Sequence, residues 1–270
     1  MVSMDADLRD QCVLITGASG GIGRALARAF AAEHARLVLH YHTGRAAAEA
    51  LRAELGAPSV VVHADLRDEP QTEAMMAAAV RHFGRVDMLI ANAGIWVEQP
   101  APLHEMTLEQ WRGTLDSDLT SAFLTCRAFL RHLAAAPRES AAIVLIGSTA
   151  ALFGEADHAD YAAAKAGLVY GLTRSLKNEI VRLAPRGRVN CICPGWTQTG
   201  MTDAAVAEPE FFQRFTATVP LRKIATPEDV AAAAVFLASE RLAGHVSGAI
   251  LPVAGGMEGR LLHPPLPENR

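Results

Sequence analysis

The sequence predicts an α/β fold in which one open, parallel sheet is covered by helices on both faces. Short apolar runs alternate with alanine-rich stretches along most of the 270 residues. The runs are continuously apolar, which is typical of strands buried on both faces. No internal repeat or low-complexity linker interrupts the alternation. We therefore expect a single, doubly wound domain.

Seven apolar runs are the expected strands, and six stretches between them are the expected helices. The strands are expected at residues 12–16, 36–41, 59–65, 88–94, 141–148, 188–195 and 249–255. The helices are expected at residues 21–33, 45–55, 70–83, 107–135, 159–184 and 227–239. A doubly wound sheet binds its ligand beyond the carboxyl ends of the strands, so functional residues are expected there.

Two segments depart from this alternation. Residues 198–220 mix glycine, proline and phenylalanine, and they suit either a mobile substrate lid or an interface segment. Residues 261–270 are rich in proline. We expect them to leave the domain, residues 1–260, as an extended arm.

Charge and composition argue against several classes of function. The net charge is -4, which gives no basic footprint for nucleic acid or an anionic membrane. The N-terminus lacks the basic and apolar regions of a targeting signal, and no apolar run is long enough to span a bilayer. We expect a soluble, cytoplasmic protein.

The cysteines and histidines form no metal-binding pattern. The four cysteines contain no CxxC pair and stand at Cys12, Cys126, Cys191 and Cys193. We expect them to be structural cysteines in a reducing compartment. His40 and His42 are close in sequence, but two ligands do not complete a zinc site. No metal is expected.

The first expected strand runs into a glycine-rich turn and then into a helix. Gly17, Gly21 and Gly23 allow a tight turn and close approach of the backbone. The helix start adds free amides and the positive end of its dipole. A dinucleotide pyrophosphate is the ligand that such a turn fits. From the glycines alone, an ordinary β-α turn stays an alternative.

A tyrosine and a lysine stand four residues apart in DYAAAKAG, residues 160–167. On a helix, Tyr161 and Lys165 would share one face. A phenol has a pKa of about 10, and a nearby ammonium lowers it by stabilising phenolate. The pair could therefore transfer protons near neutral pH. For the pentapeptide alone, a surface tyrosine and lysine are the alternative.

Five motifs in order resemble the short-chain dehydrogenase/reductase family. They are TGxxxGIG at 16–23, NAG at 92–94, a serine at 148, YxxxK at 161–165 and PGxxxT at 194–199. The resemblance implies a single-domain Rossmann-type fold with a doubly wound, parallel, seven-stranded sheet. It also implies an NAD(P)H-dependent oxidoreductase that reduces a carbonyl to an alcohol or catalyses the reverse. The sequences of these motifs are similar to those of 3-oxoacyl-carrier-protein reductases and related ketoreductases.

Four positions carry over from this family as catalytic residues. Tyr161 would be the general acid/base, and Ser148 would orient the substrate oxygen. Lys165 would lower the pKa of Tyr161 and hold the nicotinamide ribose. The fourth position is normally asparagine, but here it is Asp118. Because aspartate adds negative charge near Lys165 and lacks amide donors, we expect reduced but real activity.

The resemblance also implies a set of contacts to the cofactor. These are Thr16, Gly17, Ser19, Gly21, Ile22, Gly23, Tyr41, His42, Arg45, Asp65, Leu66, Asn92, Ala93, Gly94, Tyr161, Lys165, Pro194, Gly195, Thr197 and Thr199. An NAD-specific relative usually carries an acid after the second strand, and LHYHTGR has none. Arg45, His42 and Arg24 could instead bind a 2′-phosphate. We favour NADP (NADPH), with NAD as the alternative.

Two other functions stay open. LHYHTGRAAAEAL also resembles pteridine reductases, although these usually carry aspartate where Ser148 stands. A nonenzymatic dinucleotide-sensing protein is the other alternative, to which Asp118 lends some support.

The substrate and the assembly are less defined by the sequence. Candidate walls of a substrate pocket are Trp96, Phe153, His158, Trp196 and the phenylalanines near 211–215. Most family members assemble through the helices expected at 107–135 and 159–184. We therefore expect a homotetramer or a homodimer.

Overall fold

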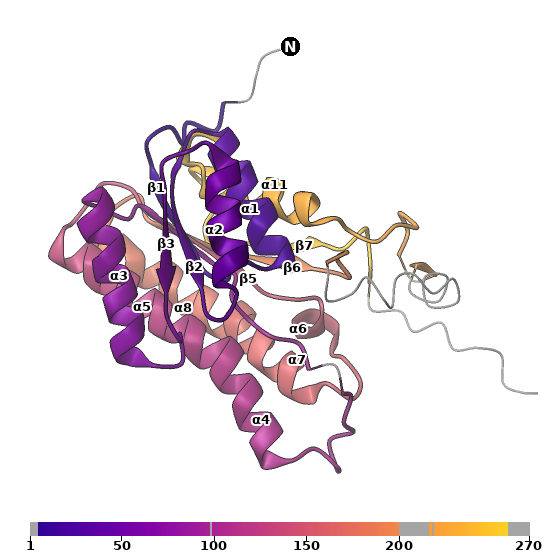
Figure 1. Cartoon of the computed structure of the whole chain (residues 1–270). Coiled ribbons are helices and arrows are strands. Elements are labelled where there is room, and N and C mark those ends of the chain that lie inside the picture. The colour runs from indigo at the N-terminus through magenta and orange to yellow at the C-terminus, as the bar shows by residue number, and fades with distance from the viewer. Residues whose placement is uncertain (1–4, 98, 200–215, 218, 259–270) are drawn as a thin grey trace, which may run out of the picture.

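The computed structural model describes residues 5–97, 99–199, 216–217 and 219–258. These residues form one seven-stranded sheet in the order β3-β2-β1-β4-β5-β6-β7, and all neighbouring strands are parallel. The strands are β1 Cys12–Ile15, β2 Arg36–Tyr41, β3 Ser59–His63, β4 Met88–Ala91, β5 Ala142–Ile146, β6 Arg188–Pro194 and β7 Ile250–Val253. The predicted Rossmann-type, doubly wound fold is confirmed (Figure 1).

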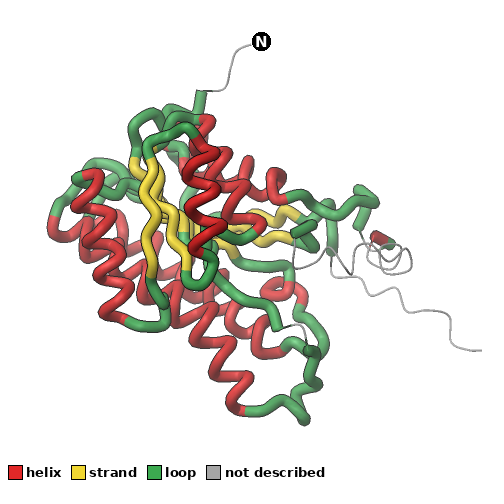
Figure 2. The backbone as a smooth tube through the Cα atoms, in the orientation of Figure 1, coloured by secondary structure: helices red, strands yellow, loops and turns green. Residues whose placement is uncertain are grey.

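Helices cover both faces of this sheet, as the tube in Figure 2 shows. One layer contains α1 Gly21–Ala32, α2 Arg45–Leu55 and α11 Pro227–Ala238. The opposite layer contains α3 Glu69–Phe83, α5 Ser121–Ala135 and α8 Thr173–Glu179. Side chains of β1 alternate between the two layers, with Cys12 and Leu14 in one core and Val13 and Ile15 in the other. Burial on both faces explains why the strands are continuously apolar.

Local signals fix several helix ends. Asp68 caps α3, where its Oδ1 accepts a hydrogen bond from Gln71 N at 2.9 Å. Thr226 and Asp229 form a capping box at the start of α11. In contrast, α1 starts after Gly20 without a side-chain cap. Its first amides therefore lie at the glycine-rich turn without a capping side chain.

Two long helices predicted as continuous contain π-helical turns. The stretch predicted at 107–135 comprises α4 Leu108–Leu115, η1 Asp116–Thr120 and α5. The stretch predicted at 159–184 comprises α7 Ala159–Ala166, η2 Gly167–Leu172, α8 and η3 Ile180–Arg182. The two π turns pack together, since a Cβ on Gly167 would lie 2.9 Å from Leu119 Cδ1. Such turns are frequent at functional sites, and η1 carries Asp118.

The remaining differences from the predicted elements are small. Several strands end one to three residues early because the polar or glycine residues that follow leave the sheet. Two short helices, α6 Ala150–Phe153 and α12 Glu240–Ala243, were not predicted. Most of the expected lid or interface segment, residues 200–215 and 218, lies outside the described residues, as does the tail 259–270. No described helix is long and apolar enough to span a bilayer.

Candidate active site

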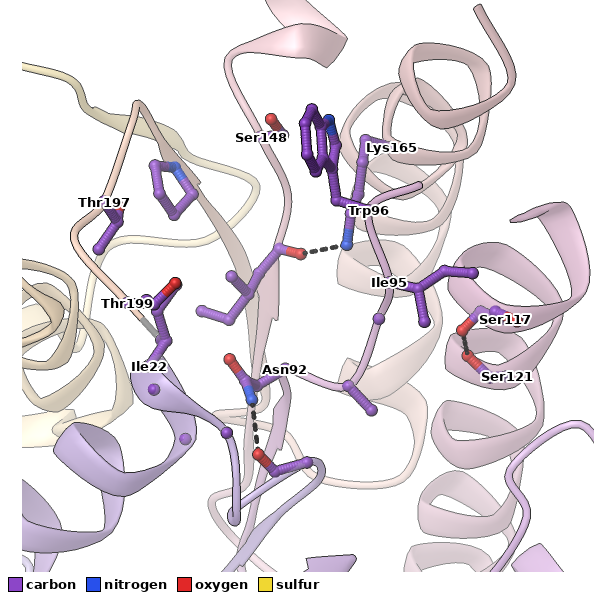
Figure 3. A pocket seen from close by; sticks show the side chains of 18 of the residues that line it. Ile22, Asn92, Ile95, Trp96, Ser117, Ser121, Ser148, Lys165, Thr197 and Thr199 are labelled. Atoms are coloured by element: carbon purple, nitrogen blue, oxygen red, sulfur yellow. Dashed lines mark hydrogen bonds between the residues drawn. The ribbon is translucent and has the colours of Figure 1, made fainter. Parts of the chain in front are cut away.

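A cavity of about 620 Å³ opens at the carboxyl end of the sheet. It lies where the strand order reverses between β1 and β4, the position at which doubly wound folds bind ligands. Figure 3 shows that its walls come from segments far apart in the sequence. Predicted residues lining it are Gly17, Ser19, Gly21, Ile22, Gly23, His42, Asp65, Leu66, Asn92, Ala93, Gly94, Ser148, Tyr161, Lys165, Pro194, Gly195, Thr197 and Thr199.

One end of the cavity is formed by backbone at the glycine-rich turn. Gly17 has φ +65°, which favours glycine. A Cβ on Gly23 would overlap the carbonyl oxygen of Gly17, and a Cβ on Gly21 would lie 2.7 Å from Thr199 Cγ2. No side chain fits at these positions, so a ligand can approach the backbone and the uncapped start of α1. The residues present therefore fit a dinucleotide pyrophosphate.

Thr16 and Asn92 hold the ends of β1 and β4 together beside this turn. Thr16 Oγ1 accepts hydrogen bonds from Asn92 N at 2.9 Å and Ala93 N at 3.0 Å. The Asn92 side-chain amide donates to the carbonyl oxygens of Thr16 and Gly17 at 2.9 and 3.3 Å. Thr16 does not line the cavity. Its hydroxyl instead positions residues that do.

His40 supports the same turn and was missed by the sequence analysis. Gly17 N donates a hydrogen bond to His40 Nδ1 at 3.1 Å, which requires an unprotonated Nδ1. His40 Nε2 lies 3.0 Å from the carbonyl oxygen of Ala64 and donates to it in this tautomer. Burial lowers the pKa of His40 to about 4. The sequence offered no signal beyond a histidine near the end of a strand.

Beyond the turn, a charged cluster lines the far end of the cavity. Arg67 donates to both Asp65 oxygens, with its Nη2 2.7 Å from Oδ2. This hydrogen bonding lowers the pKa of Asp65 to about 2. Asp65 Oδ2 also lies 3.8 Å from His42 Nε2. LHYHTGR contains no carboxylate, but the segment after β3 brings the Asp65 carboxylate beside His42.

Two residues predicted to contact the cofactor lie elsewhere. Tyr41 is buried, and its ring centroid lies 5.3 Å from that of His63. Arg45 is exposed at the start of α2. Neither lines the cavity. In contrast, Arg24 and Arg67 line it, and Arg67 was not predicted.

At the other end, α7 carries Tyr161 and Lys165 on one face, as their spacing predicted. Lys165 Nζ lies 5.5 Å from the centroid of the Tyr161 ring. Lys165 is buried, and its Nζ donates to the carbonyl oxygen of Ile146 at 3.4 Å. Ser148 follows β5 and lines the same cavity. Phenol, ammonium and hydroxyl are thus brought together from two elements.

The pKa of Tyr161 is raised above its ordinary value, whereas the sequence analysis expected Lys165 to lower it. Burial of the phenol raises this pKa most, and the charges of Asp118 and Glu155 raise it further. Lys165 and a hydrogen bond from Ser148 act in the expected direction but do not outweigh burial. A lowered pKa in the working enzyme therefore needs a further positive charge in the cavity.

Asp118 lies beside Lys165 without lining the cavity itself. Its Oδ1 accepts a hydrogen bond from Ile95 N at 2.7 Å, and its Oδ2 lies 3.5 Å from Lys165 Nζ. Burial raises the pKa of Asp118. Burial alone would lower the pKa of Lys165, but Asp118 and Tyr161 outweigh burial and raise it. Lys165 therefore keeps its positive charge in a buried ion pair.

Gly94 leaves room for this ion pair. A Cβ at position 94 would lie 2.9 Å from Lys165 Nζ and 3.1 Å from Asp118 Oδ1. The glycine of the NAG motif thus has a steric role at the reacting end of the cavity.

The predicted pocket walls are present in part. Trp96 and Trp196 line the cavity, and the His158 ring contacts Trp96 with ring centroids 4.7 Å apart and planes tilted by 33°. Phe153 is 41% exposed and does not line the cavity. The phenylalanines at 211–215 lie outside the described residues. Glu155 lines the cavity and was missed, since a single glutamate in a loop carries no sequence signal.

The cysteines lie away from solvent. All four are free and buried. Cys191 and Cys193 face the same side of β6, because a Cβ on Gly147 would lie 3.0 and 3.2 Å from their sulfur atoms. Within the described residues, no three metal-ligating side chains form a cluster.

Comparison with known proteins adds a family match. The family model adh_short_C2, described as enoyl-(acyl carrier protein) reductase, matches residues 17–258. The chain is 35% identical over 254 residues to a 3-oxoacyl-[acyl-carrier-protein] reductase from Synechocystis sp., covering 93% of this chain and 98% of that relative. It is 40% identical over 250 residues to cis-4-hydroxycyclohexanecarboxylate dehydrogenase from Sinomonas cyclohexanicum, covering 92% and 96%.

A solved structure shares the fold over nearly the full chain. It is a 7α-hydroxysteroid dehydrogenase complexed with NADH and 7-oxo glycochenodeoxycholic acid. The TM-score is 0.84 at 28% sequence identity, and the match covers 95% of this chain and 98% of that one.

Proposed function

The chain belongs to the short-chain dehydrogenase/reductase family, and from this premise we propose that it interconverts a carbonyl and an alcohol with NAD(P)(H). One observation carries the proposal. One continuous cavity is lined by Gly17, Gly21 and Gly23, which we call the glycine cradle, and by the side chains of Tyr161, Lys165 and Ser148. A dinucleotide on the cradle and a small substrate beside Tyr161 would then meet inside it.

The residues around the cavity divide between the parts of a dinucleotide. Amides at the start of α1 would bind the pyrophosphate, Lys165 would bind the nicotinamide ribose, and Thr199 would contact the carboxamide. Bound in this way, the nicotinamide would supply or accept the hydride. We favour NADPH because Arg24, His42 and Thr43 line the cavity, and because Arg67 pairs with Asp65, the carboxylate beside His42.

The protein side chains manage the proton. Tyr161 Oη would donate a proton to the carbonyl oxygen during reduction and take it back during oxidation. Ser148 would donate a hydrogen bond to the same oxygen and hold it near the phenol. Lys165 favours the phenolate, while Asp118 keeps Lys165 charged but opposes deprotonation of Tyr161. Lys165 and Asp118 themselves are 4% and 0% exposed, so water screens their charges little.

The test is the loss of reduced-nicotinamide absorbance with NADPH and with NADH. The substrate panel contains a β-ketoacyl thioester, simple ketones, a ketosteroid and a dihydropterin. We expect turnover of a carbonyl class, faster with NADPH, and its loss in Tyr161→Phe. The matched control is Tyr41→Phe, since Tyr41 is buried and does not line the cavity. Turnover of the dihydropterin alone would favour a pteridine reductase. Cofactor binding without any turnover would favour a dinucleotide sensor.

We also propose that the protein acts as a cytoplasmic homodimer or homotetramer. Phe123 on α5 and Tyr170 on η2 are 43% and 52% exposed on the two helical stretches expected at the interface. Sedimentation velocity should give a mass of two or four chains. A monomer at micromolar concentration would contradict this assembly.

A further inference from the structure

Three side chains form a distinct subsite beside Tyr161, which we name the indole subsite: Trp96, Trp196 and Glu155. The two indole centroids lie 6.1 Å apart with their planes at 74°. Trp96 Nε1 donates a hydrogen bond to Glu155 Oε1 at 3.2 Å. All three residues line the cavity that also contains Ser148 and Tyr161. Figure 3 shows Trp96 at the end of the cavity where Ser148 and Lys165 lie.

The charge of this subsite is negative. Glu155 is partly buried, and this burial raises the pKa of its carboxyl, while the Trp96 hydrogen bond acts in the opposite direction. Its titratable neighbours are His158, Asp160 and Tyr161, and no lysine or arginine of the described residues acts on it. The His158 ring contacts Trp96 in a tilted arrangement, and Asp160 Oδ2 accepts hydrogen bonds from Thr114 and Gln110 at 2.7 and 3.2 Å. The positive charge of Lys165 is paired with Asp118.

The Trp96 hydrogen bond fixes the Glu155 carboxylate. That bond uses Oε1, and no hydrogen bond to Oε2 comes from the described residues. A fixed carboxylate oxygen forms strong hydrogen bonds with hydroxyl donors and repels other anions in a partly buried site. The indole rings beside it supply rigid apolar surface.

Building on the proposed oxidoreductase function, we propose that the indole subsite selects neutral, hydroxylated cyclic substrates. The ring of the substrate packs against Trp96 and Trp196, with the reacting carbon beside Tyr161. A hydroxyl group on another carbon of that ring donates a hydrogen bond to Glu155. Glu155 is then the specificity-determining residue, and it disfavours substrates that carry a carboxylate at the same place.

Three matched probes test this selection. They are cyclohexanone, 3-hydroxycyclohexanone and 3-oxocyclohexanecarboxylate, each reduced with NADPH. For the wild type we expect kcat/KM for the hydroxy probe to exceed that for the carboxylate probe by about a hundredfold. Glu155→Gln keeps an oxygen that can accept the Trp96 hydrogen bond but removes the charge. It should reduce this ratio at least about tenfold. Because the ratio compares two probes in the same variant, a change in the pKa of Tyr161 affects both probes alike, and cyclohexanone, which lacks both groups, reports that common change.

The control variant is Glu109→Gln, which removes the same charge from an exposed position on α4. It should leave the ratio unchanged. An equal ratio in the wild type and Glu155→Gln, or a wild type that prefers the carboxylate probe, would overturn the proposal. If Glu155→Gln does not fold, Glu155→Ala should give the same loss of selectivity.

A binding measurement separates this inference from the proposed function. Tryptophan fluorescence of the enzyme with NADP⁺ reports binding of the three probes without any reaction, since two of the three tryptophans lie in the subsite. Absence of turnover with every probe would count against reduction of these ketones. Tighter binding of the hydroxy probe, lost in Glu155→Gln, would still support the indole subsite, and equal binding of all probes by both proteins would overturn it.

Discussion

The two ends of the cavity are built from different parts of the chain. At the start of α1, backbone forms the surface, because a Cβ on Gly23 would overlap Gly17 and a Cβ on Gly21 would meet Thr199. At the α7 end, side chains such as Tyr161 and Lys165 form the surface, and a buried ion pair sets their charges. The first end leaves no room for a Cβ at Gly21 or Gly23, whereas the second end depends on which chemical group each side chain carries. We therefore expect substitutions at the first end to reduce cofactor affinity and substitutions at the second end to reduce turnover.

Gly23→Ala is the substitution that we expect to disrupt the glycine cradle most. The added methyl group would overlap the Gly17 carbonyl oxygen, so the turn must move. We expect affinity for NADPH to fall by roughly a hundredfold, which corresponds to about 2.7 kcal/mol. Isothermal titration calorimetry measures the change. Gly113→Ala is the control, since a Cβ there meets nothing within 4 Å inside α4, and it should keep wild-type affinity.

Gly94→Ala tests whether an added methyl group also disrupts the reacting end of the cavity. Its Cβ would lie 2.9 Å from Lys165 Nζ, a flexible group that can move aside. We expect kcat to fall by roughly ten- to a hundredfold as Lys165 leaves its position near Tyr161. Steady-state kinetics with saturating NADPH measure this. Unchanged kcat would show that the position of Lys165 is not critical.

His40 makes the cradle sensitive to acid. Its pKa is lowered to about 4 in the folded protein, against about 6.5 in an unfolded chain. Between these values the unfolded chain binds a proton that the folded protein does not, so stability is lost as pH falls from about 6.5 to about 4. The slope approaches about 1.4 kcal/mol per pH unit.

Urea unfolding at pH 7, 6 and 5 measures this dependence. His40→Gln should be less stable at pH 7 and should have a shallower slope than the wild type. His104→Gln, at a position whose side chain is 79% exposed, is the control and should keep the wild-type slope. Equal slopes in all three proteins would contradict the role of His40.

The smallest expected effect is a change in the pH profile of Asp118→Asn. The charge of Asp118 raises the pKa of Tyr161, so its removal should lower that pKa. Alcohol oxidation needs the phenolate, and its rate should therefore rise at a lower pH, by up to about one pH unit. Asp116→Asn, on the exposed side of the same π turn, should leave the profile unchanged. Lower turnover at every pH would instead show a proton relay adapted to aspartate.

The sequence predicted the features that depend on local spacing. The strand, glycine turn and helix around Gly17 follow one another along the chain, and Tyr161 and Lys165 are separated by one helical turn. Each needs only near neighbours, so pattern and propensity are sufficient. Family resemblance then brought Ser148 and Asp118 to the same site, although neither position is notable by itself.

Features that depend on packing between distant segments were not predictable. Glu155 lies in the cavity because the loop between α6 and α7 runs toward Trp96, which donates a hydrogen bond to it. Asp65 meets His42 because β2 and β3 are neighbours in the sheet. The raised pKa of Tyr161 comes from burial, which spacing along a helix does not give. The sequence therefore predicted less of the substrate end of the cavity than of the glycine cradle.

The most direct measurement is the affinity of Tyr161→Phe for NADPH, determined together with its turnover. The variant removes one hydroxyl at the reacting end and leaves the glycine cradle intact. We predict a Kd within about threefold of the wild type and a turnover reduced by about a thousandfold. Retained turnover, or affinity lost to the same extent as turnover, would contradict the separation of binding from chemistry.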